Sequence, residues 1–414
     1  MNESVQTAIV LGAGVAGLST ALYLRRAGLD VTVVDPLPPA GGASFGNAGM
    51  ISPDTAAPIA MPGMLAKVPG WLSDPKGPLV VRPSYLAKAL PWLMRWVREG
   101  RLERVLAISD ALRALHKDTL ACWQELVGPR LFGELIRRSG HIQIWEEAGE
   151  SAGAAIERQI RERHGLEAQP LDADDLRQML PGISRKVRRA LLVPGNGYTV
   201  SPARLVGAIA EALRQEGGEI VAERAMKIIP RERGHMVMTN VANRSGAHVV
   251  VAAGAWSGQL IGPLGIKLPL ETERGYHAML PKPSIEPRYT LSYKSRGFGI
   301  TPMEGGLRCA GTVEIAGLAA PPDERRASML AEHARELFPG LTHGEPQLWM
   351  GFRPSTPDSL PILGAVPSVP GLWLAFGHGH FGMSGGPPSG KLVTSLITGA
   401  PPPIDPKPYG MERF

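Results

Sequence analysis

Residues 12–17, Gly-Ala-Gly-Val-Ala-Gly, place three glycines at a spacing that suits the pyrophosphate of a dinucleotide. In such a GxGxxG pattern one glycine forms a tight turn, one lets the pyrophosphate approach the backbone, and one lets a helix pack closely on a strand. Asp35 follows Gly12 by 23 residues, close to the ~20 at which a carboxylate accepts hydrogen bonds from a ribose. These residues predict a dinucleotide site, and a glycine-rich turn without a ligand is the alternative.

A strand, a helix and a second strand must position these residues. Residues 8–11 are a short apolar run, and residues 18–27 have helical apolar spacing that ends at Gly28. Residues 31–34 are β-branched throughout, which predicts a strand. This βαβ order places the phosphates at a helix N-terminus, where free N–H groups and the helix dipole favour anions.

Three later features favour FAD over NAD. A second apolar strand at residues 248–252 ends in a turn of small residues. A glycine-rich stretch, residues 41–47, follows Asp35 closely, where a flavin would extend. A strand at residues 372–376 is followed by a predicted glycine turn, 377–390, and a helix, 391–397. An NAD domain usually completes its site within about 150 residues, so these distant segments indicate a longer cofactor.

The rest of the pattern is simpler. Residues 36–84 are rich in Gly, Pro and Ser and predict loop. Helical spacing covers residues 84 to about 126, 149–164 and 203–216. Alternating apolar and polar positions predict an antiparallel sheet over residues 275–315, and the Pro-rich residues 401–414 predict an irregular tail.

Composition excludes several classes of function. The chain has 414 residues, enough for two or three domains, with 44% hydrophobic and 20% charged residues. Its net charge of +6 is spread out, and no basic stripe with aromatic platforms indicates nucleic-acid binding. Cys122 and Cys309 are far apart and outside any Cys/His cluster, so no zinc or iron–sulfur site is expected.

The location of the protein is a second expectation from composition. No apolar stretch reaches the ~18 residues of a membrane-spanning helix. The apolar run that starts at Ala8 leads directly into Gly12, so no cleavable signal peptide is expected. We therefore expect a cytoplasmic protein in a reducing compartment.

Three stretches carry a family resemblance: residues 43–62 (ASFGNAGMISPDTAAPIAMP), 351–364 (GFRPSTPDSLPILG) and 372–390 (LWLAFGHGHFGMSGGPPSG). They resemble the FAD-dependent amino acid dehydrogenases of the D-amino acid dehydrogenase type, within the D-amino acid oxidase-like superfamily. Weaker likeness covers residues 63–98 and 197–254. The stretches occur in the right order over most of the chain.

The resemblance implies an α/β fold with two parts. An FAD-binding Rossmann-like domain is built from discontinuous segments, residues 1–62, 191–262 and 346–414. An α+β substrate domain with a mixed, largely antiparallel sheet takes residues 63–190 as its helical part and 263–345 as its sheet part.

The resemblance also implies the reaction. A hydride passes from Cα of a D-amino acid or a cyclic imino acid, of the D-proline or hydroxyproline type, to flavin N5. The electrons then pass to an acceptor other than NAD, in a role in amino acid catabolism. Two alternatives stay open: an oxidase that reduces O2, and a flavin subunit of a multi-subunit dehydrogenase complex.

The resemblance names Arg353 and Tyr276 as substrate residues. The family uses the arginine of the Gly-Phe-Arg-Pro motif to hold the substrate carboxylate, and a guanidinium fork matches a carboxylate in bidentate geometry. Tyr276 opens a strand of the substrate domain, where its hydroxyl would donate a second hydrogen bond. A structural arginine and an ordinary sheet tyrosine are the alternatives, and His277 on the opposite strand face is less favoured.

The glycine-rich turn near the C-terminus contains His378 and His380. Its backbone N–H groups are expected to stabilise negative charge at N1 and O2 of the reduced flavin, and His380 is predicted to be catalytic. A purely structural role for either imidazole is the alternative, and a metal site lacks a third ligand. The residues expected to contact FAD are Gly12, Gly14, Val15, Ala16, Gly17, Asp35, Pro36, Ala43, Ser44, Asn47, Ala48, Gly49, Ala253, Gly254, Trp256, Gly379, His380, Phe381, Gly382 and Met383.

Attachment of FAD and association with membranes are the remaining expectations. Some relatives bind flavin covalently through a cysteine, but neither cysteine lies in the matching C-terminal stretch, so FAD is expected to be non-covalent. Residues 69–72 and 86–98 combine tryptophans with basic residues, which suits peripheral binding to the inner face of the cell membrane. A quinone or a partner redox subunit would then accept the electrons, whereas a helix that packs on the core is the alternative.

Overall fold

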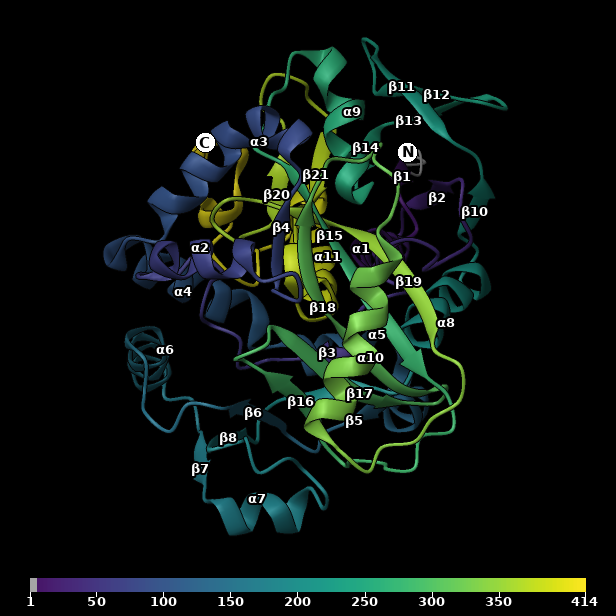
Figure 1. Ribbon diagram of the computed structural model, residues 1–414. Helices are drawn as coiled ribbons and strands as arrows, with labels where there is room; N and C mark the ends of the chain where they lie inside the picture. The colour runs from purple at the N-terminus through teal and green to yellow at the C-terminus, as the bar shows by residue number, and fades with distance from the viewer. Residues whose placement is uncertain (1–5) are drawn as a thin grey trace.

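The computed structural model describes residues 6–414, and two large sheets organise this part of the chain (Figure 1). Two expectations concern residues 1–5, which lie outside the described residues. They are the expectation of no leader peptide and the start of the domain predicted over residues 1–62. None of the helices within residues 6–414 combines the length and the apolar character needed to cross a bilayer.

The first sheet has six strands drawn from distant parts of the chain. Its order is β10 (Glu219–Ala222), β2 (Asp30–Asp35), β1 (Thr7–Leu11), β14 (His248–Val251), β21 (Leu372–Phe376) and β20 (Ile362–Ala365). All neighbours run parallel except β20 and β21, which are antiparallel. The discontinuous assembly that we predicted for this part of the fold is confirmed.

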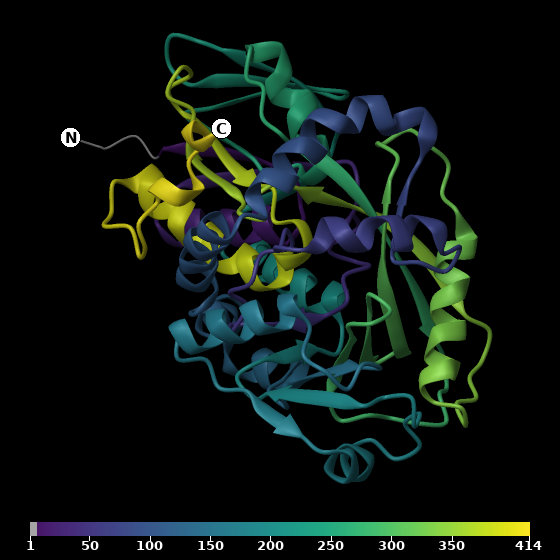
Figure 2. The ribbon, with the colours of Figure 1, turned by 60° about the vertical axis from the view of Figure 1, so that its left-hand side comes forward.

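The second sheet has nine strands. Its order is β19 (Gln347–Ser355), β15 (Glu271–Leu280), β18 (Gly306–Ile315), β17 (Phe298–Met303), β16 (Thr290–Tyr293), β6 (His141–Trp145), β8 (Arg189–Val193) and β7 (Gln169–Leu171), and β4 (Leu79–Val81) pairs with β18. Only the β16–β6 and β18–β4 pairs are parallel, so the sheet is mixed and largely antiparallel, as predicted. Helix α10 (Glu324–Leu337) lies along the outer side of this sheet in Figure 2.

The other elements connect or cover these sheets. Two small sheets are formed by β11 (Ala225–Pro230), β12 (His235–Thr239) and β13 (Asn243–Gly246), and by β3 (Met50–Ile51), β9 (Gly197–Thr199) and β5 (Ile136–Arg137). The remaining helices are α1 (Val15–Arg26), α2 (Met64–Ser73), α3 (Pro83–Glu99), α4 (Leu102–His116), α5 (Thr119–Leu135), α6 (Ala152–Arg163), α7 (Ala173–Met179), α8 (Pro202–Gln215), α9 (Ser257–Ile261) and α11 (Gly382–Thr398). The helices predicted over residues 84–126, 149–164 and 203–216 are therefore confirmed.

Two expectations about local structure were wrong. The predicted loop over residues 36–84 contains helix α2, whose internal Pro69 and flanking glycines imitate a loop. The predicted domain boundary at residue 346 falls before β19, yet β19 pairs with β15 over nine residue pairs in the second sheet. The irregular tail predicted over residues 401–414 is confirmed, since it contains two short 3-10 turns and neither an α-helix nor a strand. It is anchored to the core, because Tyr409 is fully buried and Arg413 donates to the Asp358 carboxylate at 2.7 Å.

The predicted glycine turn over residues 377–390 was too long, because α11 already begins at Gly382. Its glycines serve helix packing. A Cβ atom on Gly390 would lie 2.7 Å from the backbone nitrogen of Thr20, and one on Gly386 would lie 2.9 Å from the Val15 side chain. These glycines therefore let α11 approach α1 more closely than residues with side chains would allow.

Two prolines inside α11 leave two buried carbonyl groups without their helical donors. Pro387 and Pro388 lack N–H groups, so the carbonyls four residues earlier, at Met383 and Ser384, receive no helical hydrogen bond. Side chains of α5 replace both donors. The indole of Trp123 donates to Met383 O at 2.8 Å. The hydroxyl of Thr119 lies 2.9 Å from Ser384 O and 2.7 Å from His116 O, so these two carbonyls share its one proton.

Thr119→Val removes the hydroxyl with little change in shape and leaves the Ser384 carbonyl buried without a donor. We expect the free energy of unfolding to fall by about 1–3 kcal/mol, the cost of an unsatisfied buried polar group. Denaturant unfolding of the holoenzyme, followed by circular dichroism, measures the change. Thr20→Val is the matched control, since Thr20 is also buried and its hydroxyl donates to a carbonyl, Ala16 O, that lies within an intact helical turn. Equal losses in the two variants would contradict this explanation.

Candidate functional site

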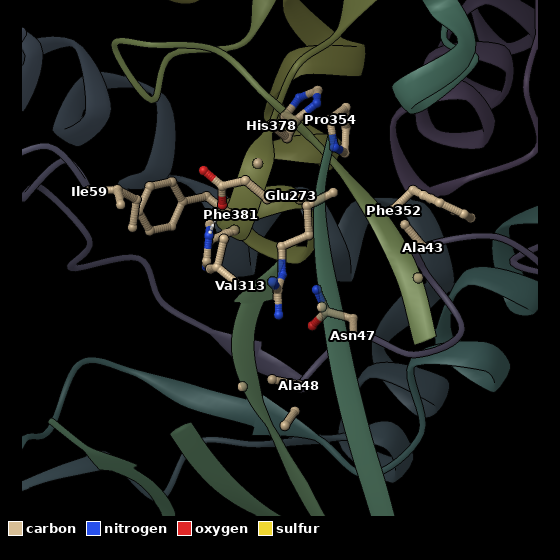
Figure 3. A pocket seen from close by; sticks show the side chains of 18 of the residues that line it. Ala43, Asn47, Ala48, Ile59, Glu273, Val313, Phe352, Pro354, His378 and Phe381 are labelled. Atoms are coloured by element: carbon tan, nitrogen blue, oxygen red, sulfur yellow. Dashed lines mark hydrogen bonds and ion pairs between the residues drawn. The ribbon is translucent and has the colours of Figure 1, made fainter. Parts of the chain in front are cut away.

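A cavity of about 1360 Å³ opens between the two sheets and is lined by residues from most segments of the chain. The carboxyl ends of β1, β2, β14 and β21 border one side, which is where open α/β sheets bind ligands. Strands β15, β18 and β19 of the second sheet border the other side. Figure 3 shows Glu273 and Val313, from the second sheet, on the same part of the cavity as Phe381.

The glycine turn after β1 has the conformation that dinucleotide binding needs. Gly12 has a φ of 121°, and a Cβ atom there would lie 2.3 Å from Ala252 O. A Cβ atom on Gly17 would lie 2.0 Å from Gly12 O, so both positions exclude other residues. Gly14 caps the N-terminus of α1 and lines the cavity. The turn therefore presents backbone N–H groups to the cavity.

Asp35 stands at the end of β2 with its carboxylate held in place by the backbone. Its Oδ2 accepts from Ala13 N–H at 2.7 Å, and its Oδ1 accepts from Leu37 N–H at 2.8 Å. Burial raises the pKa of Asp35, and these two N–H groups and Arg224 oppose that effect. Each carboxylate oxygen keeps a further lone pair for a ribose hydroxyl.

The predicted cofactor residues lie around this cavity with two exceptions. Gly17 packs against Gly12, and Gly49 (φ 79°) turns the chain where a Cβ atom would meet Met303, so neither lines the cavity. The others line it: Gly12, Gly14, Val15, Ala16, Asp35, Pro36, Ala43, Ser44, Asn47, Ala48, Ala253, Gly254, Trp256, Gly379, His380, Phe381, Gly382 and Met383.

The two histidines of the C-terminal turn have different surroundings. His378 is buried, and its Nε2 lies 2.9 Å from Ser389 Oγ. Burial, aided by His116, lowers the pKa of His378 to about 3, so its imidazole is neutral and structural. His380 lines the cavity, as His378 does, but its Nε2 lies 2.6 Å from Oε2 of Glu273.

The loop that follows Asp35 is fixed by two side chains of the second sheet. Arg308 donates from Nη1 to Phe45 O at 2.9 Å and to Asn47 O at 2.8 Å. Nδ1 of His277 donates to the intervening Gly46 O at 3.1 Å, and burial lowers the pKa of His277 to about 4. Three successive carbonyls are thus turned away from the cavity. His277 was less favoured in the sequence analysis, and Arg308 was not singled out there.

Arg353 lies across β15 with its guanidinium in the cavity. Gly275 makes this position available, since a Cβ atom there would lie 2.2 Å from Arg353 Cζ. Nη1 donates to Thr312 O at 3.0 Å, and no other hydrogen bond joins its guanidinium to the described residues. Thr312 has a φ of 55° beside a bulge between β15 and β18, a strained conformation that aims its carbonyl at Arg353. Most of the guanidinium's donors therefore remain available to a ligand.

The hydroxyl of Tyr276 does not reach the cavity. It donates to Glu314 Oε2 at 2.5 Å and accepts from Asp323 N–H at 3.1 Å, and neither partner lines the cavity. Glu273, Gly275 and Tyr276 all border the cavity, but the alternation along β15 directs the Tyr276 side chain into the core cluster that includes α10. The sequence missed Glu273 because the strand face could not be assigned without knowing which neighbours β15 pairs with.

The cavity fits FAD at both ends. Gly12, Gly14 and Asp35 form a cradle for adenosine diphosphate, and the N-termini of α1 and α11 open onto the same cavity. The family model described as FAD dependent oxidoreductase (DAO) matches residues 7–396. The chain belongs to this family. It is an FAD-dependent oxidoreductase.

Two curated relatives are similar over nearly the whole enzyme. The "D-amino-acid oxidase" of Bradyrhizobium diazoefficiens is 37% identical over 413 residues, which cover 98% of each chain. A "D-amino acid dehydrogenase" of Cereibacter sphaeroides is 31% identical over 439 residues, covering 98% of this chain and 95% of the relative.

Two solved structures share the fold. L-proline dehydrogenase from P. horikoshii superposes with a TM-score of 0.76 at 17% identity, covering 99% of this chain and 98% of the other. Glycine oxidase from Geobacillus kaustophilus gives a TM-score of 0.72 at 21% identity, covering 99% of this chain and 100% of the other. At these identities the likeness concerns the fold alone, and it confirms the predicted fold class.

Arg308→Met removes both hydrogen bonds to the loop carbonyls while keeping most of the side-chain volume. We expect the Kd for FAD to rise at least about tenfold, since one hydrogen bond from a charged donor contributes about 1.5–3 kcal/mol. Titration of the apoprotein with FAD, followed by flavin fluorescence, measures the change. Arg204→Met, at an exposed arginine paired with Glu134 and Glu304, is the matched control. If both variants bind FAD alike, the loop does not depend on Arg308.

Proposed function

We propose that this enzyme oxidises a D-amino acid, or a cyclic imino acid of the D-proline or hydroxyproline type, at its α-carbon and passes the electrons to an acceptor other than NAD. The single observation that carries the proposal is Arg353, a half-buried guanidinium with one hydrogen bond to the described residues, facing a cavity that fits FAD. The names of the curated relatives support the choice of D-amino acids.

The residues of the cavity bind and orient the substrate. When bound, FAD supplies the two-electron acceptor for the Cα hydrogen. Arg353 holds the substrate carboxylate in bidentate geometry and so fixes the position of Cα. Ile59, Val313 and Phe381 line the same region and exclude water from it. The N-terminus of α11, after Phe381, favours negative charge at the end of the cavity where it lies.

FAD is proposed to be held without a covalent bond. Cys122 and Cys309 are both buried, and neither lines the cavity. Burial raises the pKa of Cys122 to about 11 and also raises that of Cys309, so both remain thiols that are poor nucleophiles.

Anaerobic bleaching of the flavin by a panel of D- and L-amino acids, including the prolines, tests the proposed function. Arg353→Met should raise KM for the best substrate by about 100-fold or more, because the carboxylate loses a bidentate charged partner. FAD should remain bound in this variant, and Arg353→Lys should lose less. If no amino acid bleaches the wild-type flavin, the proposed function is wrong. Loss of FAD from Arg353→Met would mean that Arg353 belongs to the cofactor site.

We also propose that the enzyme is cytoplasmic and binds the inner face of the cell membrane, with a quinone or a partner redox subunit as acceptor. Helix α3 exposes an apolar stripe, Leu86, Leu90, Met94 and Val97, while Trp92 and Trp96 on its other side line the cavity. Lys88, Arg95, Arg98 and Arg101 are basic residues in or next to the same helix. Such a helix suits an anionic bilayer surface, from which an apolar acceptor would reach the cavity.

Replacing Leu90 and Met94 together with glutamine should reduce binding to vesicles that contain phosphatidylglycerol by at least about tenfold, because burial of each apolar side chain contributes about 1.5–3 kcal/mol. Co-sedimentation measures the binding. The same replacements at exposed Met238 and Val241, on and beside β12, are the control. If the wild-type enzyme binds no vesicle, the membrane proposal is wrong. If it reduces O2 to peroxide in step with substrate, the proposed acceptor is wrong and the oxidase alternative holds.

A further inference from the structure

A buried carboxylate faces the substrate region of the cavity, and the function proposed so far gives it no role. The side chain of Glu273 is 8% exposed, and its Oε2 lies 2.6 Å from His380 Nε2. Burying a carboxylate is costly unless it is paired and hydrogen bonded. Glu273 and His380 are two ionisable groups paired at the lining of the cavity, which points to a chemical role.

The sheet register places Glu273 directly beside Arg353. The two residues are antiparallel partners in β15 and β19, and both line the cavity. Side chains at such positions lie about 5 Å apart at Cβ. Yet Arg353 and Glu273 form no ion pair with each other. A positive and a negative group held apart at this spacing match the carboxylate and the ammonium group on one amino acid Cα.

The pairing with Glu273 also fixes the orientation of the His380 ring. The carboxylate can only accept, so Nε2 must carry the proton that joins them. Burial raises the pKa of Glu273, whereas the charged form of His380 and the guanidinium of Arg353 lower it, and the overall shift is downward. In its neutral form, with the proton on Nε2, His380 has a lone pair at Nδ1, and no polar atom within residues 6–414 forms a hydrogen bond with Nδ1.

We propose that His380, oriented by Glu273, removes a proton from the α-ammonium group of the substrate once Arg353 has bound the carboxylate. One N–H bond of the substrate breaks, its electron pair stays on the substrate nitrogen, and a new N–H bond forms at Nδ1. Glu273 stabilises the resulting imidazolium. The neutral amine can then assist loss of the Cα hydrogen with its lone pair. This inference rests on the proposed function.

The other titratable groups around the pair are already engaged. On β15, Glu271 accepts from Tyr85 Oη–H at 3.1 Å and does not line the cavity. His378 precedes the 3-10 turn Gly379–Phe381 that carries His380, and it is hydrogen bonded to Ser389. On α4, His116 contacts Thr55 O, and burial lowers the pKa of His116 to about 4. From β19, Arg353 contributes its positive charge. The Trp92 and Trp96 side chains of α3 add no charge.

The pH dependence of kcat/KM tests the inference with three variants. In the wild type, kcat/KM should fall at acid pH, where a general base can no longer accept the substrate proton. Glu273→Gln removes the charge that stabilises the imidazolium. The fall in kcat/KM at acid pH should therefore occur at lower pH in this variant, and the maximal kcat/KM should be smaller. His380→Gln should lower the rate near neutral pH by about 10²–10⁴-fold, the usual contribution of a general base. The remaining rate should rise with pH until the free amine forms without help.

Glu271→Gln is the matched control. Glu271 is a buried carboxylate two residues along the same strand, but it is bonded to Tyr85 and lies outside the cavity lining. It should keep the wild-type pH profile. If Glu273→Gln and His380→Gln also keep that profile, or if Glu271→Gln changes it as much as Glu273→Gln, the inference is wrong.

A second measurement does not depend on turnover. 2-Aminoisobutyrate has no Cα hydrogen and cannot be oxidised, so it can be bound to the holoenzyme at equilibrium. NMR of the ten histidines, labelled at Cε1 and assigned with His380→Gln, should show His380 becoming an imidazolium on binding in the wild type. The same resonance should remain neutral in Glu273→Gln. An unchanged wild-type resonance would overturn the inference, whereas amino acids that still bleach the flavin at high pH would leave the proposed function intact.

Discussion

Helices α1 and α11 approach so closely that a Cβ atom on Gly390 would lie 2.7 Å from the backbone nitrogen of Thr20. This contact joins the first and last segments of the chain and places two helix N-termini on one cavity. One follows the glycine turn at Gly12 and Gly14, and the other follows the turn that carries His380. The two prolines of α11 are compatible with this position only because Trp123 and Thr119 donate to the carbonyls that the prolines leave free.

The second sheet borders the same cavity and supplies the side chains to which we assign the chemistry. Along β15, alternate residues face the cavity, so Glu273 and Gly275 point toward the ligand while Tyr276 packs beneath α10. Gly275 leaves the space that the side chain of Arg353 occupies from the neighbouring strand. Further along, Arg308 and His277 reach from the same sheet to the loop at Phe45–Asn47, so one sheet positions both the substrate groups and the flavin-side loop.

Local patterns in the sequence were sufficient for the parts of the fold that depend on neighbours along the chain. The turn at Gly12, the strand that ends at Asp35 and the motif around Arg353 could all be assigned from short stretches. Contacts between distant segments could not. Glycines 386 and 390 look like a turn until the helix that packs on them is known, and the face of β15 that carries Glu273 depends on pairing with β18 and β19.

The separation of Arg353 from Glu273 bears on which molecules the cavity accepts. Two opposite charges that are buried close together would normally pair, but the register and the hydrogen bond that Arg353 donates to Thr312 O hold this guanidinium apart from the carboxylate. Glu273 is already paired with His380 at 2.6 Å, whereas Arg353 has only the Thr312 carbonyl as a hydrogen-bond partner among the described residues. A ligand without a carboxylate would leave the Arg353 guanidinium without a charged partner, which is unfavourable. The arrangement therefore favours α-amino acids over simple amines of the same shape.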